Sequence, residues 1–88
     1  MIKAITKIAH AVGLHARPAA MVVKLVNSSG EKVTLSRLGK SPVNAASMLS
    51  VLSLGLKQGE EVEISIDSDG ANDLLEQIVS LISTPLDE

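Results

Sequence analysis

Residues 13–30 read GLHARPAAMVVKLVNSSG and mark the change from loop to helix around which the rest of the chain is organised. Proline is tolerated in the first turn of an α-helix but not in its interior, so Pro18 fixes the helix start. Apolar residues follow at helical spacing, and Ser28, Ser29 and Gly30 end the pattern. Gly30 suits a left-handed cap. The segment predicts a helix over residues 16–27, with its apolar stripe at Ala19, Val22, Val23 and Val26.

The segments on either side alternate between strand and helix patterns. Residues 2–9 alternate in the manner of a strand, and residues 10–15 form a loop with Gly13 at its turn. Two further strands are predicted at 32–38 and 40–44, with a turn at Gly39 between them. Pro42 limits the second of these strands to a sheet edge or a short stretch, since proline cannot donate to a ladder.

The C-terminal half continues the alternation. Residues 47–54 predict a short helix that Gly55 stops. Residues 60–67 give the clearest strand, with Val62, Ile64 and Ile66 inward. Residues 70–83 predict the last helix, capped by Asp69 or Ser68. The order βαββαβα predicts an α+β fold, an open-faced β-sandwich with a four-stranded antiparallel sheet, three helices on one face and the other face solvated.

Length and composition restrict the class of protein. The 88 residues predict one domain over 1–88, and 45% hydrophobic residues suffice for a core. Cysteine is absent, which excludes disulfides, thiolate metal sites and cysteine nucleophiles. We find neither a signal-peptide core nor an apolar run that would insert into a membrane, so a cytoplasmic protein is expected. The chain also lacks linkers, repeats and low-complexity tracts.

Composition and charge disfavour nucleic acid as a partner. The chain has no Phe, Trp or Tyr on which bases could stack, and its net charge is -2. Residues 1–57 nevertheless hold all eight Lys and Arg and one acid (8 − 1 = +7), whereas residues 58–88 hold nine acids and no Lys or Arg (−9). Either the two halves interleave and mix their charges, or a positive face attracts acidic partners or phosphate.

His15 is the candidate nucleophile. It directly precedes the helix, and the unpaired N–H groups of the first turn, with the helix dipole, form an anion site there. Arg17 adds a permanent cation whose donors match phosphate. This environment favours neutral imidazole as the nucleophile and would stabilise a phosphoryl group after transfer. The alternative is a helix start beside an incidental surface histidine, and the arrangement alone supports only a generic anion site.

The segment GLHARPAA at 13–20 resembles the active-site signature of the HPr family, the phosphocarriers of the bacterial phosphoenolpyruvate:sugar phosphotransferase system. Residues 47–55, SMLSVLSLG, resemble the family's second signature, and GEEV at 59–62 is similar to its turn into the last strand. Length and element order agree, so the resemblance covers the whole chain.

The resemblance implies a carrier, not an enzyme. His15 would accept a phosphoryl group on Nδ1 from the phosphohistidine of enzyme I and donate it to enzyme II components, among them enzyme IIA domains. Arg17 would stabilise the phosphate, and the backbone N–H groups of Ala16 and Arg17 would cap it. Neither a metal nor another cofactor is implied, and we expect a monomer.

The resemblance also places a docking surface on the first two helices. Its apolar contacts, by position, would be Ala20, Met48, Val51 and Leu52, and Lys24 would meet acidic groups. The thioether of Met48 can adapt to several partners. Alternatively, Met48, Val51 and Leu52 are simply core residues. We expect Leu49 and Leu54 in the core and Met48 at the surface.

Ser47 has two possible roles. In many family members a dedicated HPr kinase phosphorylates the equivalent serine, and a phosphate would repel acidic partners. Ser47 is also a suitable N-cap, which alone would explain it. The preceding residue, Ala46, departs from the lysine of many regulated members and leaves recognition by the kinase open.

We consider three functions for these residues. The first is a sugar-transport carrier. The second is a regulatory relative, which works in a nitrogen-related phosphotransfer chain or binds transcription regulators, and the third is an autonomous enzyme. One non-carrier branch of the family lacks the active histidine, whereas His15 is present here. An autonomous enzyme is disfavoured, since no second acid or base accompanies His15. His10 matches no signature and is expected to be a solvated loop histidine.

Overall fold

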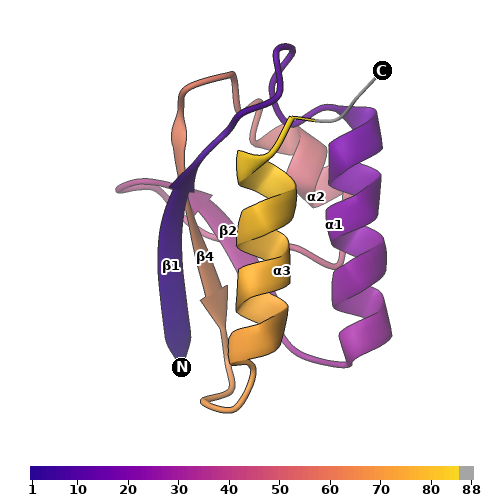
Figure 1. Cartoon of the computed structure of the whole chain (residues 1–88), viewed down its shortest axis with the longest axis vertical. Coiled ribbons are helices and arrows are strands. Elements are labelled where there is room, and N and C mark those ends of the chain that lie inside the picture. The colour runs from indigo at the N-terminus through magenta and orange to yellow at the C-terminus, as the bar shows by residue number, and fades with distance from the viewer. Residues whose placement is uncertain (86–88) are drawn as a thin grey trace.

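The computed structural model describes residues 1–85 and contains four strands and three helices in the predicted order βαββαβα. All three helices, α1 (Ala16–Ser29), α2 (Met48–Ser53) and α3 (Asn72–Ser83), lie on one side of the sheet (Figure 1). The α+β fold expected from the sequence is confirmed. Ile2–Lys7 form β1, Val33–Arg37 form β2, Val43–Asn44 form β3 and Glu61–Ile66 form β4.

The sheet is antiparallel throughout, with strand order β1-β4-β2-β3. The central strand β4 pairs along its whole length with β1, from Ile2 opposite Ile66 to Lys7 opposite Glu61. The prediction for β4 is confirmed, because Val62, Ile64 and Ile66 are fully buried. β3 is shorter than predicted and lies at the sheet edge, where the missing N–H of Pro42 is tolerated.

One hydrophobic cluster joins the sheet to the helices. Alternate residues of β2 and β4 meet the inward stripes of α1 and α3, which include Ala19, Val22, Ile78 and Ile82. The buried hydrophobic side chains of this core are all aliphatic, since the chain has no Phe, Trp or Tyr. Helix α1 begins at Ala16 with Pro18 in its first turn and ends at Gly30, which adopts the predicted left-handed conformation with φ 72°.

The predicted cap of α3 is wrong. The helix begins at Asn72, after Ala71 as N-cap, and neither Asp69 nor Ser68 caps it. Ala71 is buried, and its carbonyl accepts the first helical hydrogen bond from the Leu75 N–H. Packing of Ala71 and Leu74 against the core therefore sets this helix start, in place of a polar side chain.

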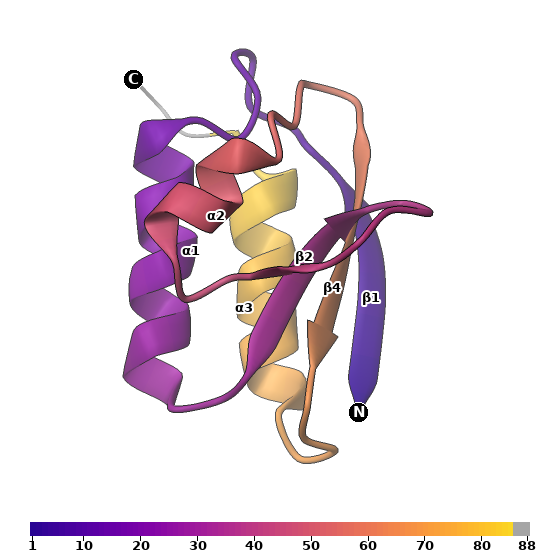
Figure 2. The same ribbon diagram turned by 180° about the vertical axis from the view of Figure 1, so that it is seen from behind.

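Both alternatives for the charge distribution are realised in part. The halves mix at the sheet, where Lys7 lies opposite Glu61 and Arg37 pairs with Glu60. They separate on the helical layer, because α1 contains Arg17 and Lys24 without an acid, and α3 contains Asp73 and Glu76 without a Lys or Arg. Helices α1 and α3 run side by side in opposite directions (Figures 1 and 2). The helical layer thus has a basic side and an acidic side.

Candidate functional site at the start of the first helix

His15 occupies the N-cap position of α1. Its backbone is extended, with φ -98° and ψ -165°, and its carbonyl accepts the first helical hydrogen bond, from the Ala19 N–H. The His15 side chain does not cap the helix. The helix offers no acceptor to the N–H groups of Ala16 and Arg17, and Pro18 has none to satisfy. The half-buried imidazole therefore sits beside two backbone donors at the positive end of a helix dipole.

Arg17 lies in the same first helical turn with an exposed side chain. Within residues 1–85 it forms no ion pair or hydrogen bond. Its guanidinium therefore keeps its donors available for an anion at the helix start. The structure brings together three of the predicted site residues, His15, Ala16 and Arg17, on consecutive positions of one loop-to-helix junction.

The loop before His15 is held by backbone contacts that require glycine at position 13. Gly13 adopts φ 81°, and a Cβ there would lie 2.2 Å from the Leu56 carbonyl oxygen. That oxygen accepts the Leu14 N–H at 2.9 Å, and the Gly13 carbonyl accepts the His15 N–H at 3.0 Å. The loop before α1 is thus pressed against residue 56, so the loop that follows α2 helps to place His15.

The loop that carries Leu56 is fixed by Glu60. Both carboxylate oxygens of Glu60 accept hydrogen bonds from Arg37, at 3.0 and 3.1 Å, and one also accepts the Lys57 N–H. Hydrogen bonding to Arg37 and to the Lys57 backbone lowers the pKa of Glu60, and the same carboxylate raises the pKa of Arg37. Arg37 also donates to the Gly55 carbonyl at 3.3 Å. This ion pair closes the turn on which Gly13 rests.

His10 is not the solvated loop residue that the sequence suggested. It is 3% exposed, and its Nε2 lies 3.0 Å from the Leu81 carbonyl oxygen near the end of α3. The neighbouring Ala9 N–H donates to the Ile82 carbonyl, so two consecutive residues attach to consecutive carbonyls. No local pattern at residue 10 reveals this, because the covering groups come from a helix end 71 positions away.

The predicted docking residues separate into two sets. Ala20, Lys24 and Leu52 are exposed on α1 and α2. Val51 is 1% exposed and belongs to the core, so its side chain cannot contribute contact area to a partner. Met48 is half-buried and packs against the core, as does Leu54.

Leu49 corrects the sequence prediction in the opposite direction. The sequence predicts it in the core, whereas it is 81% exposed. In the short helix α2, positions 48, 51 and 54 share the inward face, which leaves Leu49 and Leu52 outward. Because α2 is apolar on more than one face, periodicity could not choose between these arrangements. The exposed apolar side chains of α2 are Leu49 and Leu52.

Ser47 is the N-cap of α2. Its Oγ accepts the Ser50 N–H at 3.3 Å, and its backbone is extended. The predicted capping role is confirmed. Ser47 is half-buried at the helix start, next to the surface that Leu49 exposes.

A hollow of about 240 Å³ lies beside His15 and is also lined by His10, Val12 and Gln58.

Two other kinds of site, a metal centre and a membrane span, find no support in the part of the chain that the structure describes. Residues 1–85 contain no cluster of three or more His, Cys, Asp or Glu that could hold a metal ion. The same residues include no helix with the length and apolarity needed to cross a membrane.

The comparisons with known proteins agree with this geometry. Residues 2–84 match the family model for the PTS HPr component phosphorylation site. The chain belongs to the HPr family. It is 46% identical over 78 residues to the phosphocarrier protein HPr of Streptomyces coelicolor, a match that covers 89% of this chain and 84% of that protein.

Solved HPr structures share the fold. HPr of Thermoanaerobacter tengcongensis superposes with a TM-score of 0.83 at 33% identity, over 93% of this chain and 91% of that one. Crh, the Bacillus subtilis catabolite repression HPr, superposes with a TM-score of 0.71 at 28% identity, over 97% and 100% of the two chains. The chain is thus a phosphocarrier of the HPr family and not a catalytic enzyme.

Proposed function

We propose that His15 carries the phosphoryl group between enzyme I and enzyme IIA domains of the sugar phosphotransferase system, and that residues 1–88 act as one cytoplasmic, monomeric domain. The observation that supports this most directly is the position of His15. It stands at the N-cap of α1 without capping it, beside the N–H groups of Ala16 and Arg17. Such a junction binds a phosphoryl group where imidazole can reach it.

The proposed transfer is an in-line displacement at phosphorus. The lone pair of His15 Nδ1 forms a bond to the phosphorus as the bond from phosphorus to the donor histidine of enzyme I breaks. The donor imidazole keeps the electron pair of that bond. Negative charge on the three equatorial oxygens is stabilised by the two backbone N–H groups and the Arg17 guanidinium. The reverse sequence of bond changes passes the group to the next partner.

Docking for both transfers is proposed on α1 and α2. Ala20, Leu49 and Leu52 would provide apolar contact, with Met48 at its inner edge, and Lys24 would meet an acidic side chain. Val51 is left out because it is buried. Basic residues on α1 without a neighbouring acid on that helix would steer acidic partners toward His15.

Phosphotransfer measured by intact mass tests the carrier role. Wild-type protein incubated with phosphoenolpyruvate and enzyme I should gain one acid-labile phosphoryl group, and His15→Ala should gain none. The variant keeps His10, the other histidine of the chain, so it reports on any transfer to that residue. An adduct on His15→Ala, or none on wild type with active enzyme I, would overturn the proposal.

A second, regulatory function is favoured by Ser47. Its place at the start of α2 would put a phosphate beside the proposed docking residues Leu49 and Leu52, where it would repel acidic partners. An HPr kinase would form this phosphoserine, and the modified chain would bind transcription regulators. Incubation with a kinase and ATP should give an acid-stable phosphate that mass spectrometry maps to Ser47 and that Ser47→Ala lacks. Phosphate on another serine, or none, would remove the regulatory role.

A further inference from the structure

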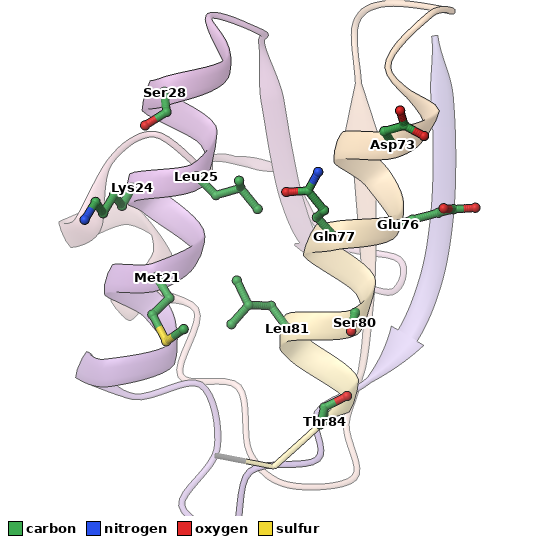
Figure 3. Close-up of a pocket in the computed structure, with 10 residues that line it drawn as sticks. All are labelled: Met21, Lys24, Leu25, Ser28, Asp73, Glu76, Gln77, Ser80, Leu81 and Thr84. Carbon is green, nitrogen blue, oxygen red and sulfur yellow. The ribbon is translucent and has the colours of Figure 1, made fainter. Parts of the chain in front are cut away.

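A hollow lies between α1 and α3, away from the surface that carries Leu49 and Leu52. It is a shallow groove of about 950 Å³. Met21 and Leu25 contribute to it from α1, and Gln77 and Leu81 from α3, with their side chains directed into the space between the helices (Figure 3). Met21 is 42% exposed, so the floor is an accessible apolar surface.

The rims of this groove differ in charge. Asp73 and Glu76 line the α3 side of the groove, where the Glu76 carboxylate points away from α1, and Lys24 extends from the outer side of α1 (Figure 3). Helix α3 has no Lys or Arg, and the sequence has none after Lys57, so no neighbouring cation on the helix neutralises its acidic rim. A partner that fills the groove therefore meets mainly apolar side chains and the Gln77 amide along its floor, and two carboxylates along its outer edge on α3.

We propose that this groove binds a basic amphipathic helix of another protein. An extended segment on this mostly aliphatic floor would leave backbone N–H and C=O groups unpaired, whereas a helix satisfies them internally. Two antiparallel helices also present ridges between which a third can pack. Leucine-like side chains of the partner would contact Met21, Leu25 and Leu81, and its Lys or Arg residues would face Asp73 and Glu76.

This groove shares Lys24 with the proposed phosphotransfer surface, but its apolar floor and its charge preference are different. Phosphotransfer partners would approach Arg17 and Lys24 with acidic groups, whereas the groove partner approaches Asp73 and Glu76 with basic ones. The inference does not depend on the phosphotransfer role, because it rests on the shape and charge of α1 and α3 alone.

A designed peptide provides the probe. It has roughly 16 residues, a leucine stripe on one face and lysines on the other, and a control peptide keeps the leucines and replaces each lysine with glutamate. Titration into ¹⁵N-labelled full chain should give saturable shifts at amides 21–28 and 73–84, with little change at 47–52. The glutamate peptide should bind at least about tenfold more weakly, and added salt should weaken the lysine peptide.

Two matched double variants test whether the acidic residues of the groove attract the lysine peptide. Asp73→Lys with Glu76→Lys reverses the rim, and Glu61→Lys with Asp67→Lys makes the same change of net charge on exposed residues outside the groove. The rim variant should raise the Kd of the lysine peptide about tenfold or more, and the control variant by much less. Met21→Gln, which adds no charge, should also weaken binding.

Three results would overturn the inference. Shifts centred on residues 47–52 would move the site to the docking surface. Equal affinities of the two double variants for the lysine peptide would show that the peptide binds by non-specific charge attraction. Absence of saturable shifts at millimolar peptide would show that the groove binds no such helix.

Discussion

His10 Nε2 donates a hydrogen bond to the carbonyl oxygen of Leu81, 3.0 Å away and 71 positions later in the chain. A carbonyl can only accept, so Nε2 carries the proton. The His10 carbonyl in turn accepts the Gly13 N–H, and the Gly13 carbonyl accepts the His15 N–H. A chain of hydrogen bonds therefore connects the end of α3 to the backbone of the proposed phosphoryl acceptor.

Removal of this hydrogen bond should destabilise the protein and loosen the loop. His10→Ala leaves the Leu81 carbonyl without its imidazole donor and is expected to cost about 1–3 kcal/mol in the free energy of unfolding. His10→Gln, whose amide can donate, should recover part of that loss. Urea unfolding followed by far-UV circular dichroism measures both, since the chain has no aromatic fluorophore. Equal stability of His10→Ala and wild type would contradict this role.

Gly13 should be intolerant of any side chain. Gly13→Ala combines a left-handed backbone with a Cβ placed 2.2 Å from the Leu56 carbonyl oxygen, so the loop must move. We expect a loss of about 2–4 kcal/mol in the free energy of unfolding from the two effects, and a slower transfer to His15. Urea unfolding measures the loss, and the rate of phosphoryl uptake from enzyme I measures the transfer.

Gly39→Ala is the matched control for this variant. Gly39 has φ 78°, but the position that a Cβ would take there has no atom within 4 Å, so only the conformational cost of about 1 kcal/mol applies. Similar losses in the two variants would show that the contact with Leu56 is unimportant.

The Glu60–Arg37 pair should make stability depend on pH in the acid range. Hydrogen bonds from Arg37 and the Lys57 N–H lower the pKa of Glu60 below the usual value of a glutamate side chain. The folded state therefore binds the proton less readily than the unfolded state. The contribution of Glu60 to the free energy of unfolding is complete above the pKa that Glu60 has in the unfolded chain. It is lost as the pH falls through the lower pKa that Glu60 has in the folded protein.

Glu60→Gln should lower stability at neutral pH. It should also reduce the loss of stability that the wild type shows as the pH falls, which is called the acid limb of its stability profile. Its control is Glu76→Gln on an exposed helical position, which should leave the limb in place. Urea midpoints from about pH 2 to 7, the range over which carboxylates titrate, provide the measurement. If both variants keep the acid limb of the wild type, another carboxylate is responsible.

Substitutions at two neighbouring positions of α2 should affect docking and stability separately. Leu49→Asp changes an 81% exposed side chain, so the free energy of unfolding should stay within about 0.5 kcal/mol while transfer from enzyme I slows. Val51→Ala opens the core and should cost about 1–3 kcal/mol with transfer by the remaining folded protein largely unchanged. Urea unfolding and the rate of phosphoryl uptake measure the two effects. A loss of stability in Leu49→Asp together with slower transfer in Val51→Ala would contradict the prediction. It would place Leu49 in the core and Val51 on the docking surface.

The sequence alone determined the features that depend on near neighbours. Pro18 and Gly30 bounded α1, strict alternation identified β4, and GLHARPAA placed His15 at a helix start and pointed to the family. These features are local because cap conformations, proline geometry and side-chain alternation are set within a few residues. Element order then restricted the fold to a sheet with helices on one face.

Only the tertiary structure decided what depends on distant contacts. His10 is buried because the end of α3 covers it, and Val51 is buried instead of Leu49 because α2 turns the face of positions 48, 51 and 54 inward. The start of α3 is set by the burial of Ala71 and not by a polar cap. A six-residue helix with apolar residues on several faces, or a lone loop histidine, is compatible with more than one packing. The choice rests on the core that segments far apart in the chain build together.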